Sequence, residues 1–209
     1  MKRHGYLNRQ HDGNIAWLVR PSCRQLFFVY SGAYGTLDGL GATDFLRRSS
    51  LGNRNVVLMR DPYQFARFEQ GVSSEINSLE ALLEWHLEFV ESCDHVDEVY
   101  CTGNSIGGNS ALLFGHKLSA KKVWAFAPAD LPTLPVLLGL LNEPNGTTEY
   151  EIHYSRQQWF DQAFAEALDG LPGVELIRNE KHGHMMLRGL ALDGDLPHIY
   201  APYRSCAAD

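Results

Sequence analysis

The segment with the clearest capacity for chemistry is Gly103-Asn-Ser-Ile-Gly107, which fits the pattern G-x-S-x-G. A β-rich run, Val96–Thr102, precedes it and a helical run, Ser105–Leu118, contains its serine. This context predicts that Ser105 lies on a sharp turn from strand to helix, with a strained backbone and an exposed hydroxyl. Residues two positions away on either side must then lack side chains, because a side chain there would collide with the turn. The pattern indicates a nucleophilic serine.

The same segment predicts how negative charge on a reacting carbonyl oxygen would be stabilised. A helix that begins at Ser105 points its free N–H groups and the positive end of its dipole toward the serine. The N–H of the next residue, Ile106, is therefore a candidate oxyanion donor. A phosphate-binding loop is excluded, because Asn109 stands where such a loop needs lysine.

The elements that must position this turn are short β-rich runs separated by longer helical ones. Strands are predicted at Ile15–Val19, Leu26–Tyr30, Asn55–Met59, Val96–Thr102, Lys122–Ala127, Tyr150–Tyr154 and Val174–Arg178. Helices are predicted at Ser74–Val90, with Ser74 as cap, and at Ser105–Leu118, Gln158–Leu168 and Met185–Leu192. This alternation predicts a single α/β domain over residues 1–209, with a mostly parallel central sheet and helices on both faces.

Charge and composition exclude several classes of function. The 18 basic and 25 acidic residues give a net charge of −7, which argues against nucleic-acid binding because phosphate contacts need clustered lysine and arginine. No run approaches 18 apolar residues, so no membrane span is expected. The basic first 13 residues lack the apolar run of a signal peptide. The four cysteines are scattered without metal-binding spacing, so we expect reduced thiols in a cytoplasmic protein.

From about residue 15 to residue 192 the chain resembles an α/β hydrolase of small, nearly lidless type. The most specific part of the resemblance is Gly103–Gly108 between its strand and helix. The resemblance implies a three-layer α/β/α fold and a triad in the chain order serine, acid, histidine. In that order the base follows the last strand and the acid follows the strand before it. The chemistry of such a triad needs no cofactor and no metal.

Two histidines, His182 and His184, follow the last predicted strand, where the family places its base. Gly183-His184 resembles the Gly-His pair that is usual there, so His184 is the favoured base and His182 the alternative. A zinc site at His182 and His184 would need a third ligand, and the sequence does not supply one.

The acid is harder to assign, because the family's usual Gly-x-x-Asp is absent after Tyr150–Tyr154. The first carboxylate in that region is Asp161, which we assign as the acid. At the start of a helix it could instead serve only as a cap. Asp130, one strand earlier, is the alternative acid.

The second oxyanion donor is expected in the loop after Leu26–Tyr30, where family members often have His-Gly-x. Ser31-Gly-Ala33 keeps the glycine, so the Ala33 N–H is the candidate, with Gly32 and Tyr34 as alternatives.

These residues predict a serine hydrolase that cleaves a small-molecule carboxylic ester or thioester through an acyl-enzyme on Ser105. Segment 128–149 is where this fold inserts a lid, and it is long enough only for a short one. Its apolar start suits either the wall of a substrate pocket or the packing of the core. Two alternatives remain open. One is an acyltransferase or thioesterase of polysaccharide, lipid or secondary-metabolite assembly. The other is a non-catalytic binding module that retains the fold.

Overall fold

The computed structural model describes residues 8–63, 65, 67–143, 145–146 and 148–201. Its strands form one eight-stranded sheet in the order β1-β2-β4-β3-β5-β6-β7-β8. The strands from β3 to β8 pair in parallel, whereas β1 and β2 join the β4 edge in antiparallel pairs. Their bounds are β1 Asn8–Gln10, β2 Ile15–Leu18, β3 Gln25–Tyr30, β4 Asn55–Met59, β5 Glu98–Asn104, β6 Lys122–Phe126, β7 Glu149–Ser155 and β8 Val174–Asn179. The predicted mostly parallel sheet is confirmed.

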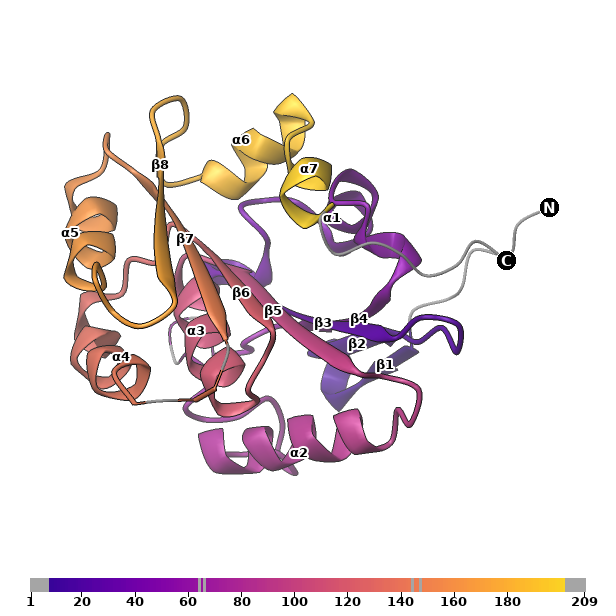
Figure 1. The fold of residues 1–209 in the computed structure, drawn as a ribbon. Helices are drawn as coiled ribbons and strands as arrows, with labels where there is room; N and C mark the ends of the chain where they lie inside the picture. The colour runs from indigo at the N-terminus through magenta and orange to yellow at the C-terminus, as the bar shows by residue number, and fades with distance from the viewer. Residues whose placement is uncertain (1–7, 64, 66, 144, 147, 202–209) are drawn as a thin grey trace.

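Helices cover both faces of this sheet, so the fold has three layers (Figure 1). The α-helices are α1 Ala42–Arg48, α2 Leu79–Glu91, α3 Ile106–Lys117, α4 Leu134–Leu141, α5 Trp159–Ala167, α6 Met186–Asp193 and α7 Leu196–Tyr200. The short 3-10 helices are η1 His11–Gly13, η2 Ala33–Gly35, η3 Leu51–Asn53 and η4 Leu131–Thr133.

Two apolar cores lie between these layers, and the side chains of β3 alternate between them. Leu26 and Phe28 pack with α2, α3, α4 and α5, whereas Phe27 and Val29 pack with α1, α6 and α7. All four side chains are buried. A strand buried on both faces has an unbroken apolar sequence, and β3 reads LFFVY after its first residue.

The structure corrects the predicted start of the longest helix. The helix α2 begins at Leu79 with Ser78 as its cap, because the Ser78 hydroxyl accepts a hydrogen bond from the Ala81 N–H at 3.1 Å. The predicted start at Ser74 is wrong. Residues before the helix form a separate turn, in which the Val72 N–H donates to the Ile76 carbonyl at 2.8 Å.

The cysteines correct a second expectation. Cys93 and Cys101 are free and buried. Cys23, however, is disulfide-bonded, so the expectation of reduced thiols throughout is wrong at this residue. Spacing along the sequence gave no sign of it, because the fold decides which cysteines meet. Cys206 lies outside the described residues.

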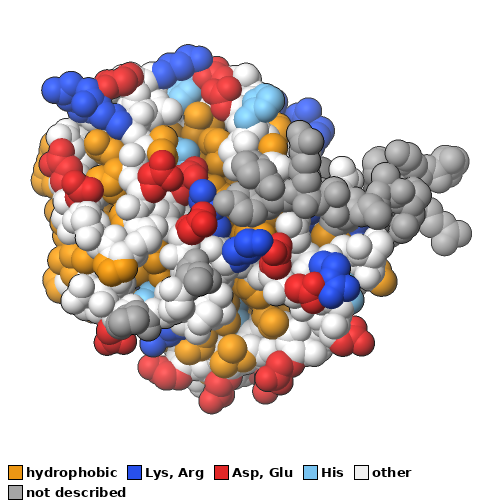
Figure 2. Space-filling view, in the orientation of Figure 1, with side chains coloured by type: hydrophobic (Ala, Val, Ile, Leu, Met, Phe, Trp, Pro, Cys, Tyr) orange, Lys and Arg blue, Asp and Glu red, His pale blue; other side chains and the backbone are white. Residues whose placement is uncertain are grey.

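Surface charge bears on nucleic-acid binding, and helix length bears on a membrane span. On the face drawn in Figure 2, basic and acidic side chains are interspersed over the upper and middle parts, acidic ones predominate along the lower edge, and no stripe of basic side chains is seen. No helix in the described part of the chain is both long enough and apolar enough to cross a membrane.

Candidate active site

Ser105 lies between β5 and α3, on the turn that the sequence predicts. Its φ of 53° and ψ of −127° are a positive-φ conformation that is uncommon outside glycine. A Cβ at Gly103 would collide with the backbone at Gly107, and one at Gly107 would collide with the carbonyls at the end of β3. Both glycines are therefore required by close backbone approach, as expected from their spacing around the serine.

Two hydrogen bonds connect Ser105 to the candidate base and, through it, to the candidate acid. The His184 Nε2 lies 3.1 Å from the Ser105 Oγ. The His184 Nδ1 lies 2.8 Å from the Asp161 Oδ1. The structure thus brings together Ser105, Asp161 and His184 from three separate segments of the chain, and these are the three residues that the sequence predicts as nucleophile, acid and base.

The positions of Asp161 and His184 follow from the elements on which they lie. Asp161 lies in the first turn of α5, where the helix dipole favours a carboxylate, and its side chain is fully buried. His184 follows β8 directly before α6, with the Phe160 ring at 5.4 Å from its own. The hydrogen bond to Asp161 raises the pKa of His184, and partial burial opposes this rise. Such an ion pair stabilises an imidazolium, the species that forms when histidine takes a proton from serine.

The alternative base, His182, and the alternative acid, Asp130, contact side chains outside the candidate triad. His182 is bound to Asp193, with 2.8 Å between its Nε2 and the Asp193 Oδ2. Asp130 forms an ion pair with Arg67. Within the described residues, no group of three or more His, Cys, Asp or Glu side chains is arranged to hold a metal ion.

The loop after β3 narrows the choice of the second oxyanion donor. The Gly32 N–H is already used, because it donates to the Thr36 carbonyl at 2.9 Å and to the Asn104 Oδ1 at 3.2 Å. Among the described residues, the N–H groups of Ala33 and Tyr34 donate to no protein acceptor, and the same is true of Ile106 at the start of α3. The N–H groups of Ala33, of its alternative Tyr34 and of Ile106 therefore stay available as oxyanion donors, whereas Gly32 does not.

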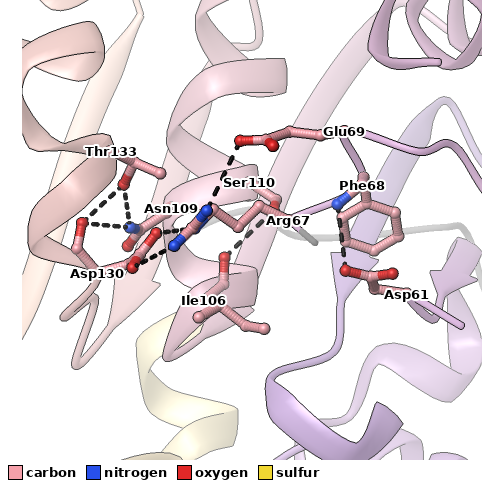
Figure 3. A network of polar contacts seen from close by, with 9 residues as sticks. All are labelled: Asp61, Arg67, Phe68, Glu69, Ile106, Asn109, Ser110, Asp130 and Thr133. Carbon is pink, nitrogen blue, oxygen red and sulfur yellow. Dashed lines mark hydrogen bonds and ion pairs between the residues drawn. The ribbon is translucent and has the colours of Figure 1, made fainter. Parts of the chain in front are cut away.

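The ion pair of Asp130 belongs to a network that connects the loop after β4 to α3 (Figure 3). Arg67 reaches from that loop to Asp130, and Asn109 of α3 donates to the Thr133 Oγ1 at 2.6 Å. Asp61 fixes the other end of the loop by accepting from the Phe68 N–H at 3.2 Å. Sequence reasoning did not find Arg67, because its partner lies 63 residues further along the chain.

Segment 128–149 contains η4 and α4 in its described part. Leu137 and Leu141 of α4 are buried in the core, whereas Val136 is 63% exposed. Together with α3 and Arg67 the segment also walls an apolar cavity of about 100 Å³. Core packing, one of the two uses expected of its apolar residues, therefore occurs, whereas none of the three candidate triad residues lines this cavity.

Comparison with known proteins supports the fold. No protein-family model matches the chain, and no curated sequence matches it. Among solved structures, a dienelactone hydrolase from Anabaena variabilis superposes with a TM-score of 0.62 at 14% identity, over 89% of this chain and 90% of that one. An α/β serine hydrolase homologue from Coxiella burnetii gives 0.62 at 13% identity, over 98% and 99% of the two chains.

A third similar structure, from Xanthomonas campestris, is described as an α/β serine hydrolase without a lid. It superposes with a TM-score of 0.56 at 15% identity, over 93% of this chain and 90% of that one. The chain therefore has the α/β-hydrolase fold.

Proposed function

We propose that the protein is a serine hydrolase that cleaves a carboxylic ester or thioester through an acyl-enzyme on Ser105. The observation that carries the proposal is the continuous hydrogen-bonded path from the Ser105 Oγ through His184 to Asp161. Hydrogen-bond contact between a nucleophile and a base that a third group orients is the geometry of acyl transfer.

The first half of the reaction forms the acyl-enzyme. The Ser105 Oγ attacks the substrate carbonyl carbon while the His184 Nε2 takes the hydroxyl proton. The oxyanion of the tetrahedral intermediate accepts hydrogen bonds from the Ile106 and Ala33 N–H groups, and each such donor contributes about 3–4 kcal/mol to transition-state stabilisation. His184 then returns the proton to the leaving alcohol or thiol, and the carbon–oxygen or carbon–sulfur bond breaks.

The second half releases the acid. Water attacks the acyl-enzyme while His184 takes one of its protons. When the second tetrahedral intermediate collapses, the bond between the acyl carbon and the Ser105 Oγ breaks and His184 returns that proton to the Oγ, which regenerates the hydroxyl. Asp161 keeps the imidazole in the tautomer that presents a free Nε2 to the serine and stabilises its charge. An acceptor alcohol in place of water would give acyl transfer by the same steps.

Exposed apolar side chains beside these residues favour an apolar ester. Tyr34 adjoins the candidate donor Ala33 and is 72% exposed, and its ring lies 5.8 Å from that of Phe65. Trp159, also 72% exposed, precedes the Phe160 that contacts His184. Because large apolar side chains exposed together mark binding sites, we expect acyl chains of several carbons to be preferred over acetyl.

The test uses a fluorophosphonate probe and a series of p-nitrophenyl esters from acetyl to octanoyl. We expect the probe to label Ser105, as located by peptide mass spectrometry, and the esters to be hydrolysed. The variant Ser105→Ala should remain folded by circular dichroism, resist labelling and lose nearly all hydrolysis. A wild-type protein that neither reacts with the probe nor cleaves any ester or thioester would favour the binding module. Preferential transfer to an added alcohol would favour the acyltransferase.

A further inference from the structure

A second buried carboxylate, Asp38, lies close to the candidate triad. It occupies a tight turn between Leu37 and Leu40, whose backbones bond to each other at 3.0 and 3.3 Å. Asp38 and Gly39 have φ angles of 54° and 80°, the left-handed pair that an Asp-Gly turn adopts. Both leucines are buried in the same core as α6, so the turn is firmly placed.

One oxygen of this carboxylate binds the start of the helix that follows the candidate base. The Asp38 Oδ2 accepts from the Leu187 N–H at 2.9 Å, three residues after His184. The N-cap residue of α6, Met185, provides no side-chain cap of its own. Asp38 therefore satisfies an N–H that the helix leaves unpaired, and its charge interacts favourably with the helix dipole.

The other oxygen binds the residue next to the candidate nucleophile. The Asp38 Oδ1 accepts from the Asn104 Nδ2 at 2.5 Å, and Asn104 directly precedes Ser105. The opposite end of the same amide, Oδ1, accepts from the Gly32 N–H at 3.2 Å. Gly32 directly precedes Ala33, and a Cβ at Gly32 would collide with Asn104. One Asp–Asn pair thus contacts the segments that carry the nucleophile, the base and an oxyanion donor.

We propose that Asp38 and Asn104 form a positioning pair that holds His184 and the Ala33 N–H in register with Ser105. The proposal rests on the proposed function, and it adds two residues that touch no reacting atom. A displacement of about 1 Å between reacting groups costs up to about 100-fold in rate. A pair that fixes three segments at once would therefore act mainly on kcat.

Charge provides a second consequence of the same arrangement. The contacts to the Asp38 oxygens come from the Asn104 amide and from the backbone N–H groups of Leu187 and Arg188, all of which are donors and favour the ionised carboxylate. Burial raises the pKa of Asp38, and its negative charge in turn raises the pKa of His184. The other charged groups here are Asp161, from α5, and Arg188 of α6, which lies beside Gly39.

The experiment is a double-mutant cycle with Asp38→Asn, Asn104→Asp and the double variant that exchanges the two side chains. Asparagine tolerates the left-handed φ at position 38, so the turn is preserved. Asp38→Asn should lower kcat about 10- to 100-fold with little change in KM. In Asn104→Asp two carboxylates face each other, and we expect a comparable loss.

The exchanged double variant should restore the pairing of the two positions. The amide now at position 38 again donates to the carboxylate now at position 104, and its oxygen still accepts from the Leu187 N–H. We therefore expect kcat to recover to within about fivefold of wild type.

A measurement without substrate separates this proposal from the proposed function. We would titrate His184 by NMR in wild type and in each variant, with His184→Gln to assign its signal. The pKa of His184 should fall in Asp38→Asn and recover in the exchanged variant, where the charge returns beside Ser105. This readout applies even if no ester is cleaved.

The matched control is Asp44→Asn, which removes an aspartate on the surface of α1 that pairs with Arg47 and Arg48. It should change neither kcat nor the His184 titration. Additive losses in the double variant, or an Asp38→Asn protein with unchanged kcat and unchanged His184 titration, would overturn the positioning role. A loss of melting temperature that accounts for all the lost activity, with no shift of the His184 titration, would reduce Asp38 to a structural residue.

Discussion

Asp130 and Asp161 follow two adjacent parallel strands, β6 and β7. Both therefore lie at the carboxyl ends of the strands, as Ser105 does after β5. Asp130 faces a guanidinium and connects the loop after β4 to the segment after β6. Asp161 faces an imidazole that itself reaches the serine. The two carboxylates follow neighbouring strands and differ in the basic side chain that each contacts. Position after a strand therefore limits the candidates for a catalytic acid to these two residues, and the contact with His184 is the reason for proposing Asp161.

The largest effect should come from removing the imidazole that distinguishes the two carboxylates. We expect His184→Ala to reduce kcat about 10⁶-fold, as loss of the serine would, because the two act as one unit. The matched control is His182→Ala, two residues away, which should keep kcat within about threefold since its partner is Asp193. Steady-state kinetics on one p-nitrophenyl ester measure both. A severe loss in His182→Ala instead would mean that the base has been misassigned.

The next effect concerns the carboxylates themselves. Asp161→Asn should lower kcat about 10⁴-fold, because an amide no longer holds the imidazole in the tautomer that accepts the serine proton. Its melting temperature should change only slightly, since the amide can occupy the same buried site. Kinetics and a thermal melt of the same preparation measure both quantities. Should Asp161→Asn remain active, His184 must be oriented by another group and the site is a Ser–His dyad.

The pH profile sharpens the same comparison. The base works in its neutral form, and Asp161 raises the pKa of His184 above its ordinary value of 6.5. The acidic limb of kcat/KM should therefore lie above pH 6.5, with activity falling about tenfold per pH unit below it. In the residual activity of Asp161→Asn the limb should move to lower pH. A wild-type limb below pH 6.5 would show that the carboxylate does not support the imidazolium.

The raised pKa of His184 also makes the stability of the fold depend on pH, in the direction opposite to activity. A histidine whose pKa is raised in the folded state stabilises the fold below the unfolded pKa, and this contribution is lost as the pH rises through the folded-state pKa. The ion pair between His184 and Asp161 thus stabilises the fold most at a pH where His184 is protonated, the form that the proposed mechanism makes inactive.

The smallest effect is expected at the other carboxylate. Asp130→Asn should reduce the free energy of unfolding by about 1–2 kcal/mol, because it weakens a charged contact that is largely shielded from water. Activity on small esters should stay within about threefold. Chemical denaturation and kinetics of the same preparation measure the two quantities. An activity loss without a stability loss would mean that Asp130 acts on the reaction, and the comparison with Asp161 would fail.

Local signals predicted much of this molecule. Most strands, and the helices α3, α5 and α6, lie within one or two residues of their predicted bounds, because buried strands have apolar runs and G-x-S-x-G specifies a turn from strand to helix. The sequence analysis does not predict the helix α4. Its Pro135 lies in the first turn, a position where proline is compatible with a helix. The helix α1 was missed because it is only seven residues long and buries just Phe45 and Leu46.

The site was predictable in its chemical types and less so in its supporting residues. The family order of serine, acid and histidine pointed to Ser105, Asp161 and His184. Nothing local connects Asp38 to Leu187, which lies 149 residues away, and Asn104 occupies a variable position of its motif. Such contacts depend on the fold. From the sequence alone, Asp38 is visible only as part of an Asp-Gly turn, and Asn104 only as a polar residue before the serine.

The backbone at Ser105 also bears on how this sequence balances stability against activity. A side chain at φ 53° carries a conformational cost of about 1–3 kcal/mol that glycine would avoid. A glycine at this position would lower the free energy of unfolding by roughly 0.4–1 kcal/mol, because the unfolded chain would become more flexible. This loss is smaller than the conformational cost that the glycine would remove. Selection for thermal stability alone would therefore favour glycine at position 105. A serine at this strained position is what the proposed function predicts, because a nucleophile is worth its cost in fold stability only where selection acts on a reaction.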